Sequence, residues 1–286
     1  MKKFILLLAA LFLFPLKDLH TKGFFYEVAG SGAKIYLMGS IHMAKQNAFP
    51  LDSVIEKAFE SCDNLVLEIN LNNINPTEIL QYGMFQDTTK LEDIVPQKYF
   101  KILDSLFSLY SFPKVIYNKL KPWVAVLLLV SLQMTQASDE FIPGVEIYFL
   151  NKIKSTQRVL ELESFKKQID VFQSLYNLNP DDFFEYFLMK KDSMDIQFEQ
   201  LYEAWLKGDE NAVQYLMEQE FDDFELSKKY QEILLEQRNQ DMTNKIEEFL
   251  GQKGCYFVVV GAGHLIGEIG IVKLLRKKGY VVNRLL

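Results

Sequence analysis

Two short motifs of the pattern Gly-x-x-His carry the residue types best suited to chemistry in this chain. Gly39-Ser40-Ile41-His42 follows the apolar run Ile35 to Met38, and Gly261-Ala262-Gly263-His264 follows Phe257 to Val260. The chain has three histidines, so these motifs hold two of them. A histidine just beyond the carboxyl end of a buried strand can be a metal ligand or an acid or base. The simpler alternative is that each imidazole caps a helix or satisfies nearby backbone groups.

Glutamates end two further segments that we interpret as strands. Glu68 follows the buried-type run Asn64 to Leu67, and Glu163 ends Arg158 to Glu163. A right-handed strand-helix-strand connection places Glu68 at the same sheet edge as His42. A buried, unpaired carboxylate is costly, so it needs a cation, a metal or hydrogen bonds; an exposed glutamate paired with a lysine is the alternative. Glu161 shares the strand face of Glu163, and we prefer Glu163 because it is nearer the strand end.

Three polar residues late in the chain are further candidates. Arg238 and Asn239 lie in the last long predicted helix and could donate to a ligand, although a surface arginine is the simpler interpretation. Glu268 lies four residues after His264. On a helix it would share the face of His264, where it could orient the imidazole or instead point to solvent.

Length and charge limit the class of protein. A chain of 286 residues suits one large domain or two small ones, and its 49% hydrophobic content is enough for a sizeable core. The net charge of -7 and the pI near 5.2 argue against nucleic-acid binding, which needs a basic face. We therefore expect a peptide or small-molecule substrate.

Residues 1–21 resemble a targeting segment. Met1-Lys2-Lys3 is basic, and the apolar run Phe4 to Phe14 ends at Pro15. This run has the length of a signal-peptide core and is short for a membrane span. No clear A-x-A cleavage site follows, so the prediction is export to the periplasm or the extracellular space, with an uncleaved membrane tether as the alternative. His20 lies in this segment and is not a ligand candidate.

Cys62 and Cys255 are the two cysteines of the chain. Each lies just before an apolar strand, so in a parallel sheet both would lie at the same edge. A disulfide is then plausible in an exported protein, and two buried free thiols are the alternative. Neither cysteine has a second one nearby, which excludes a zinc site of the cysteine type.

The order of elements predicts an α/β fold with a central, mostly parallel sheet, flanking helices and a helical insertion. Phe24 to Val28 and Ala33 to Met38 read as a hairpin, and Cys255 to Val260 and Tyr280 to Arg284 as later strands. Residues 22–286 then form a single domain. Its helical cap comprises about 75–157 and 165–250, and Trp123 to Met134 is its core helix.

Six sequence blocks, in this order, resemble the TraB/GumN family, which includes the Tiki metalloproteases. They are Tyr36 to His42, Leu65 to Glu68, Leu160 to Ser164 with Gln168, Trp205 to Asp209, Arg238-Asn239 with Met242, and Val259 to Gly267. The resemblance covers nearly all of the chain after the targeting segment.

This resemblance implies a fold like that of erythromycin-esterase/ChaN-like proteins. It also implies a peptidase dependent on a divalent metal, with His42 and His264 as ligands, Glu68 as third ligand or general base, and Glu163, Arg238 and Asn239 as site neighbours. Such ligands suit Mn, Co or Zn. Arg238 and Asn239 would stabilise the developing oxyanion. The alternatives are a metal-free, esterase-type hydrolase with a histidine general base, and a non-catalytic protein that binds a peptide or small ligand.

Overall fold

The computed structural model describes residues 23–30, 32–137, 141–189, 191–218 and 224–286, which form an α/β fold around a six-stranded sheet. The predicted targeting segment lies outside these residues. The strand order is β6-β4-β7-β2-β1-β8. The strands are β1 (Phe24–Ala29), β2 (Ala33–Ser40), β4 (Asn64–Leu67), β6 (Arg158–Glu161), β7 (Gly254–Gly261) and β8 (Val281–Arg284).

The sheet is mixed, as the sequence predicts. β6, β4, β7 and β2 run parallel to one another, whereas β1 is antiparallel to both β2 and β8. The predicted hairpin of β1 and β2 is therefore confirmed. β2, β4 and β7 are central and buried along most of their length, which explains their continuous apolar runs.

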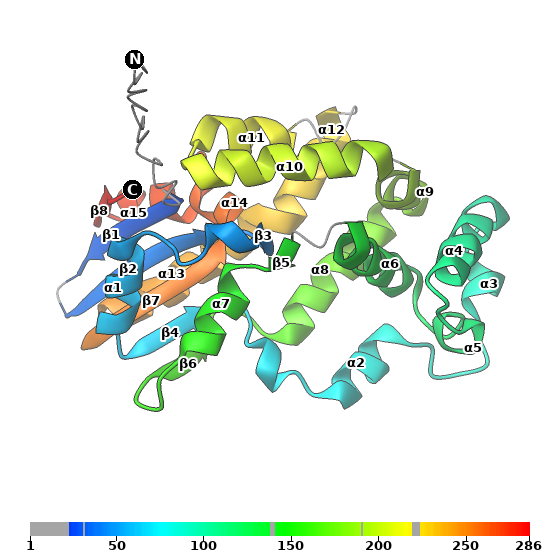
Figure 1. The fold of residues 1–286 in the computed structure, drawn as a ribbon, viewed down its shortest axis with the longest axis horizontal. Helices are drawn as coiled ribbons and strands as arrows, with labels where there is room; N and C mark the ends of the chain where they lie inside the picture. Colours follow the sequence, from blue (N-terminus) through cyan, green and yellow to red (C-terminus); the bar gives the residue numbers. More distant parts are fainter. Residues whose placement is uncertain (1–22, 31, 138–140, 190, 219–223) are drawn as a thin grey trace, which may run out of the picture.

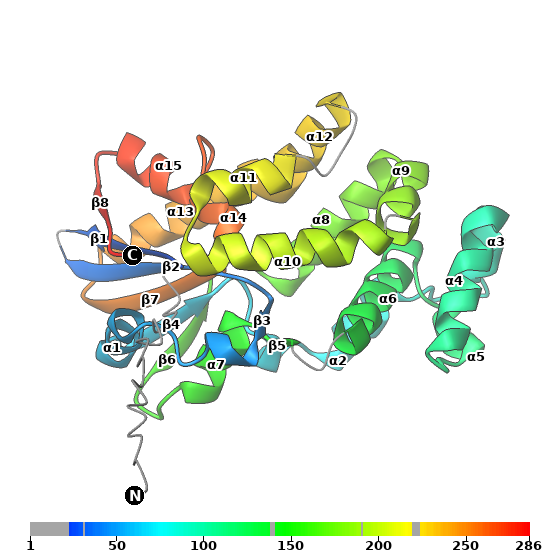
Figure 2. The same cartoon turned by 45° about the horizontal axis from the view of Figure 1, so that its top comes forward.

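The helices form layers on the sheet and a separate lobe (Figures 1 and 2). α1 and α7 cover one face of the sheet, and α13 and α15 cover the other. The helices are α1 (Ser53–Ser61), α2 (Pro76–Gly83), α3 (Leu91–Ile94), α4 (Gln97–Leu109), α5 (Lys114–Tyr117), α6 (Pro122–Ala137), α7 (Val145–Lys152), α8 (Phe165–Leu178), α9 (Pro180–Phe184), α10 (Lys191–Lys207), α11 (Glu210–Glu218), α12 (Phe224–Gln231), α13 (Gln237–Leu250), α14 (Ala262–Leu265) and α15 (Ile271–Lys277). Two 3-10 helices, η1 (Gln46–Ala48) and η2 (Leu71–Asn73), and two π-helices, η3 (Glu185–Met189) and η4 (Glu232–Glu236), complete the described helical structure.

The helical lobe, made of α3 to α6, α8, α9 and η3, has its own hydrophobic core. Tyr99, Phe107, Phe183 and Leu129 are among its buried side chains. α6 contributes Leu129 and contains the predicted core helix. In contrast, α7 and α13 lie within the predicted cap ranges but bury their apolar side chains in the core of the sheet. Within the described part of the chain, no helix combines the length and the apolar content needed to cross a bilayer.

A second sheet of two strands was not expected from the sequence. β3 (Met43–Lys45), directly after His42, pairs antiparallel with β5 (Phe141–Pro143), directly before α7. This second, two-stranded sheet brings the amino end of α7 to the first Gly-x-x-His motif. Gly144 allows the backbone before α7 to approach the first motif, since it has no side chain. A Cβ at this position would lie 1.8 Å from the carbonyl oxygen of Ile41.

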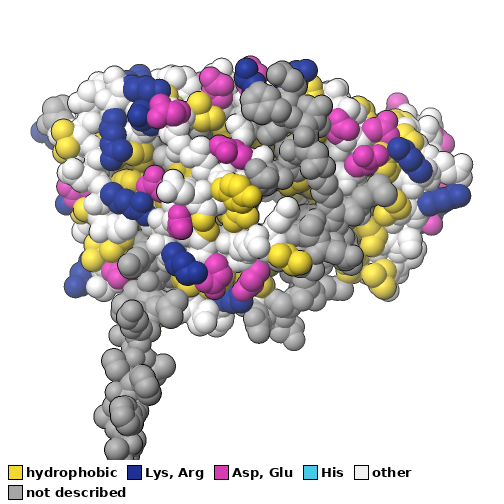
Figure 3. Space-filling model, turned by 90° about the horizontal axis from the view of Figure 1, so that it is seen from above, with side chains coloured by type: hydrophobic (Ala, Val, Ile, Leu, Met, Phe, Trp, Pro, Cys, Tyr) yellow, Lys and Arg dark blue, Asp and Glu magenta, His cyan; other side chains and the backbone are white. Residues whose placement is uncertain are grey.

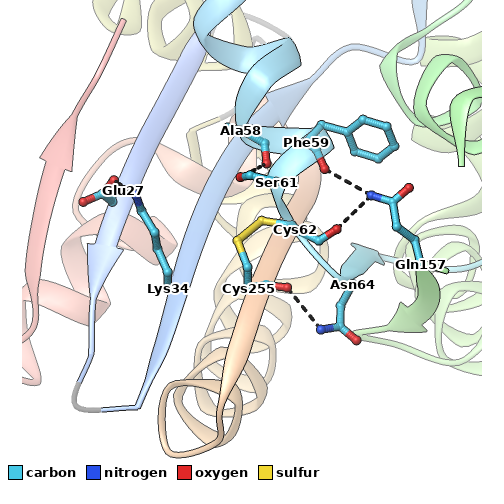
Figure 4. Close-up of a disulfide and its surroundings, with 9 residues drawn as sticks. All are labelled: Glu27, Lys34, Ala58, Phe59, Ser61, Cys62, Asn64, Gln157 and Cys255. Atoms are coloured by element: carbon cyan, nitrogen blue, oxygen red, sulfur yellow. Dashed lines mark hydrogen bonds and ion pairs between the residues drawn. A yellow bond between two sulfur atoms is a disulfide. The ribbon is translucent and has the colours of Figure 1, made fainter. Parts of the chain in front are cut away.

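Cys62 and Cys255 form a disulfide (Figure 4). Cys62 ends α1 just before β4, and Cys255 is the second residue of β7, so the bond joins the amino ends of neighbouring strands. Nearby, Asn64 Nδ2 donates to the carbonyl oxygen of Cys255 at 3.1 Å. Of the two alternatives for these cysteines, a disulfide or two free thiols, the structure contains the disulfide.

Figure 3 shows the molecule from above, the side on which α10 and α11 lie in Figure 1. Among the described residues of this face, Lys and Arg side chains are interspersed with Asp and Glu side chains, and small apolar patches lie between them.

Candidate active site

The strand register brings the two motifs and the two glutamates to one edge of the sheet. Ser40 pairs with Gly261 across β2 and β7, so both motifs leave the sheet at the same level. Glu68 directly follows β4, which lies on the other side of β7. The N–H of Glu163 donates to the carbonyl oxygen of Glu68 at 2.8 Å, continuing the pairing of β6 with β4. The carboxyl ends of four parallel strands therefore build the site, as expected for an α/β sheet.

Asn239 fixes the tautomer of His264. The side-chain Nδ2 of Asn239 donates to the carbonyl oxygen of Ile269 at 2.9 Å, so its Oδ1 is the acceptor that faces the imidazole. This oxygen lies 2.6 Å from Nδ1 of His264, which must carry the proton. Nε2 of His264 is then an unprotonated nitrogen with a lone pair. Burial lowers the pKa of His264 to about 4, so the ring is neutral near pH 7.

Glu68 faces this lone pair. Its Oε1 lies 3.7 Å from Nε2 of His264 and accepts the N–H of Gly261 at 2.7 Å. Burial raises the pKa of Glu68, but the positive charges of Arg238 and His42, together with the Gly261 N–H, oppose this and hold the pKa below its usual range. Glu68 is therefore ionised at neutral pH.

His42 is held in a different way. Its Nδ1 lies 3.1 Å from Oε1 of Glu146, the second residue of α7, and that oxygen also accepts the Ser40 hydroxyl at 2.6 Å. The negative charge of Glu146 raises the pKa of His42 to about 9. His42 therefore carries a positive charge at neutral pH, although its side chain is 80% exposed. Because Nδ1 faces Glu146, Nε2 is the nitrogen open to a ligand.

Arg238 joins the two glutamates. Its Nε donates to both oxygens of Glu163 at 3.0 and 3.1 Å, and its Nη2 donates to Glu163 at 2.6 Å and to Glu68 at 2.7 Å. Gln168 on α8 adds a donor at 3.2 Å from Glu68 and 3.4 Å from Glu163. The side chain of Glu163 is fully buried, so this pairing supplies the cation that a buried carboxylate requires.

The contacts correct one expectation for Arg238. The simpler interpretation of Arg238 as a surface residue is wrong, since Arg238 and Asn239 are both buried on α13. Arg238 Nη1 donates to the carbonyl oxygen of Leu234, and Asn239 Nδ2 donates to that of Ile269. Each of these nitrogens carries a second hydrogen, so the oxyanion role stays a prediction. Both residues position the side chains of the site.

The alternatives for Glu161 and Glu268 are also resolved by their contacts. Glu161 is exposed and accepts the backbone N–H of Asn70 at 2.6 Å, whereas Glu163 points into the site. Glu268 lies beyond α14 and pairs with Lys273 at 3.0 Å. The idea that Glu268 orients His264 is therefore wrong, because Asn239 does so.

A cavity of about 390 Å³ opens over these residues. His42, Arg238 and His264 line it, and apolar side chains of α10, α11 and the η4 region form much of the rest of its wall. Trp205 on α10 lines the same cavity and donates its indole N–H to the carbonyl oxygen of Gly39 at 2.9 Å, which ties α10 to the first motif. The volume lies in the range typical of small-ligand sites.

The predicted metal ligands are only partly assembled. Among the described residues, no group of three or more His, Cys, Asp and Glu side chains is arranged to hold a metal ion. Glu68 and His264 lie together, while His42 lines the same cavity but pairs with Glu146. The structure thus contains a preformed pair and a third candidate donor.

Sequence reasoning missed Glu146. Its one local signal was its place in the first turn of a helix that follows Pro143-Gly144, which is common and carries no functional information. Its proximity to His42 depends on the pairing of β3 with β5, about a hundred residues apart in the chain.

Comparison with known proteins gives two kinds of relative. The chain is 22% identical over 245 residues to the uncharacterized protein YbaP of Escherichia coli (strain K12), covering 84% of this chain and 87% of that protein. It is 44% identical over 50 residues to the metalloprotease TIKI homolog of Amphimedon queenslandica. The latter match covers 17% of this chain and only 10% of that protein.

A family model covers nearly the whole chain. It spans residues 24–284, and therefore the sheet, the helical lobe and every site residue described above. The extent of this match, together with the two motifs at the sheet edge, confirms the resemblance seen in the sequence. The chain belongs to the TraB/PrgY/gumN family.

Proposed function

We propose that this chain is a metal-dependent hydrolase of the peptidase type, with His42, Glu68 and His264 as the metal ligands. The observation that carries this proposal is the pair formed by Glu68 and His264. A carboxylate oxygen and an unprotonated imidazole nitrogen face each other at 3.7 Å, and the tautomer set by Asn239 leaves no proton between them.

The chemistry of this pair suits a divalent ion. Metal–nitrogen and metal–oxygen bonds of about 2.1 Å place two ligands of one ion roughly 3–4 Å apart, which matches the separation of the pair. A neutral histidine and an ionised carboxylate are the forms that bind metals, and His264 and Glu68 have these forms at neutral pH. Mn, Co and Zn all accept nitrogen and oxygen ligands.

The surrounding residues have defined tasks in this proposal. Asn239 holds the tautomer of His264, and Arg238 and Gln168 hold Glu68 in place. His42 would complete the ligand set by losing the proton on Nε2 while Nδ1–H stays paired with Glu146, because a metal-bound imidazole is neutral. A bound ion would supply Lewis acidity to the scissile carbonyl and to the attacking water.

The peptide bond is proposed as the substrate because of the similarity to the metalloprotease TIKI homolog, which includes only a short stretch of either chain. The metal-free, esterase-type alternative has less electrostatic support. A general base works best with a pKa near the working pH. His264 has a pKa of about 4 and is a weak base, and His42, at about 9, is already protonated.

We also infer that the protein is exported and that its fold is of the erythromycin-esterase/ChaN-like kind. Export is supported by the basic and apolar amino-terminal segment and by the disulfide, which is stable in oxidising compartments. The fold inference is supported by parallel strands that place two Gly-x-x-His motifs at one sheet edge.

The proposal is tested with a mixture of synthetic peptides whose products are read by mass spectrometry. We expect cleavage by the wild-type protein with Mn, Co or Zn, loss of cleavage with a chelator, and recovery when metal is returned. Glu68→Gln should be inactive, while the matched variant Glu161→Gln should keep activity because Glu161 is exposed and accepts the backbone N–H of Asn70.

Other outcomes identify the alternatives. Hydrolysis that a chelator leaves unchanged and that Glu68→Gln abolishes would point to a metal-free hydrolase. Peptides that bind without turnover under every metal condition would point to a binding protein.

A further inference from the structure

A second cavity lies next to the one over the site. It has a volume of about 190 Å³ and extends between α11 and the loop that follows α14. Met217, Gln231, Leu235 and Gly263 line both cavities, so the two spaces share a wall.

Met217 is part of this shared wall and packs against Gly263. A Cβ added to Gly263 would lie 2.7 Å from Cε and 2.9 Å from Sδ of Met217, so the thioether packs directly over the residue before His264. Methionine is unbranched and has three rotatable bonds, which lets it move aside at low cost. Met217 is also only partly buried, so a rotation can carry its end away from Gly263.

The two cavities differ in their lining. Leu201, Val213 and Leu234 give the first cavity an apolar wall opposite the site. The second cavity adds polar groups, namely Gln214 and Glu218, which are hydrogen-bonded to each other at 2.8 Å. A ligand that spans both spaces would therefore place an apolar group beside His264 and a polar portion beyond Met217.

We propose that Met217 is a movable partition between two subsites, and that the site takes an elongated, chain-like ligand with an apolar group next to the reacting bond. This inference rests on the proposed function, because it takes the first cavity as the site of reaction. It makes Met217 a residue that determines which ligand lengths bind, with no part in the chemistry itself.

The test is the binding of a nested series of synthetic peptides, from a dipeptide to an octapeptide around one leucine, measured by calorimetry with a chelator present. The wild-type protein should bind the longer peptides about ten-fold more tightly than the shorter ones, in line with the loss of one pocket's contacts. Met217→Trp should remove this advantage by filling the shared wall, and Met217→Leu, which keeps the volume, should retain it.

Gln214→Trp is a second variant, since Gln214 is exposed and lines the second cavity but not the first. It should also remove the advantage of the longer peptides while the shorter ones bind as before. Affinity that is independent of length, an advantage that survives both tryptophan variants, or no binding of any peptide would each overturn the inference.

Failure of the proposed function gives a different result. Length-dependent binding with no cleavage in any metal would sink the hydrolase proposal and keep the partition. Metal-dependent cleavage, with binding that depends neither on peptide length nor on Met217→Trp, would keep the hydrolase proposal and overturn the partition.

Discussion

His42 and His264 end motifs of the same Gly-x-x-His pattern but occupy opposite electrostatic environments. His42 is exposed beside the carboxylate of Glu146, which raises its pKa to about 9. His264 is buried against Asn239, and burial lowers its pKa to about 4. Near pH 7 one ring is therefore charged and the other neutral. The difference comes from the neighbours that each ring meets on α7 and α13, and the motifs themselves carry no sign of it.

Removing the charge of Glu146 should lower the pKa of His42. In Glu146→Gln the main cause of the upward shift is gone, so we expect the His42 pKa to fall from about 9 toward 6.5. The measurement is an NMR titration of the imidazole C–H resonances in metal-free protein. Glu161→Gln is the control and should leave the titration unchanged. A midpoint that stays near 9 in Glu146→Gln would show that another group holds the proton.

His264 should make the fold sensitive to acid. Its folded pKa lies below the unfolded value of 6.5, so its contribution to stability is complete above pH 6.5 and is lost as the pH falls through about 4. The shift corresponds to a loss on the order of 3 kcal/mol in the free energy of unfolding. Urea unfolding of the metal-free protein across this pH range measures this loss in the free energy of unfolding. In His264→Gln the free energy of unfolding should fall less steeply between these pH values. An equally steep fall would rule out His264 as the source of the acid sensitivity.

Secondary-structure elements set the site through their register. The apolar runs before the two motifs predict β2 and β7, and the register of these strands places the motifs side by side. Glu68 and Glu163 could be assigned from their positions at strand ends, because carboxyl ends of parallel strands meet at one edge. The role of α7 could not be predicted, since β3 and β5 are only three residues long and pair across a large separation in the chain.

The disulfide should stabilise the strands that carry Glu68 and His264. Cys62 and Cys255 are separated by 193 residues, and loss of a native disulfide of this kind typically costs about 2–5 kcal/mol. We expect the free energy of unfolding of the Cys62→Ser/Cys255→Ser double variant to be lower by that amount. In urea unfolding this appears as a lower midpoint concentration. Wild-type protein treated with a reductant is the control and should behave like the double variant. Equal midpoints for the oxidised wild type and the double variant would contradict this role.

At the scale of the whole molecule, a sheet-based body carries the site and a helical lobe extends from it (Figure 1). The α/β class and the hairpin followed from the apolar runs and the turn between them, and α6 was identified as a core helix from its apolar run. The separate core of the lobe could not be predicted. Tyr99 and Phe183 are buried in it, and their positions in the sequence do not show which helices they contact.

The distribution of roles among Arg238, Asn239 and Glu268 also depended on the whole fold. α13 crosses the sheet so that Arg238 reaches Glu163 and Asn239 reaches His264. α14 ends at Leu265, so Glu268 falls outside the helix whose spacing predicted a contact with His264. Helical spacing is a sound guide only within one helix, and the sequence did not show where this one stops.

The most direct test of the account is the metal content of the purified protein after incubation with Mn, Co or Zn and removal of free metal. The wild-type protein should retain close to one ion per chain, and Glu161→Gln should match it. His264→Ala and Glu68→Gln should retain far less, because each removes one member of the preformed pair. A wild-type protein that retains none of the three metals, or equal retention in the wild type and both variants, would contradict a metal centre at Glu68 and His264.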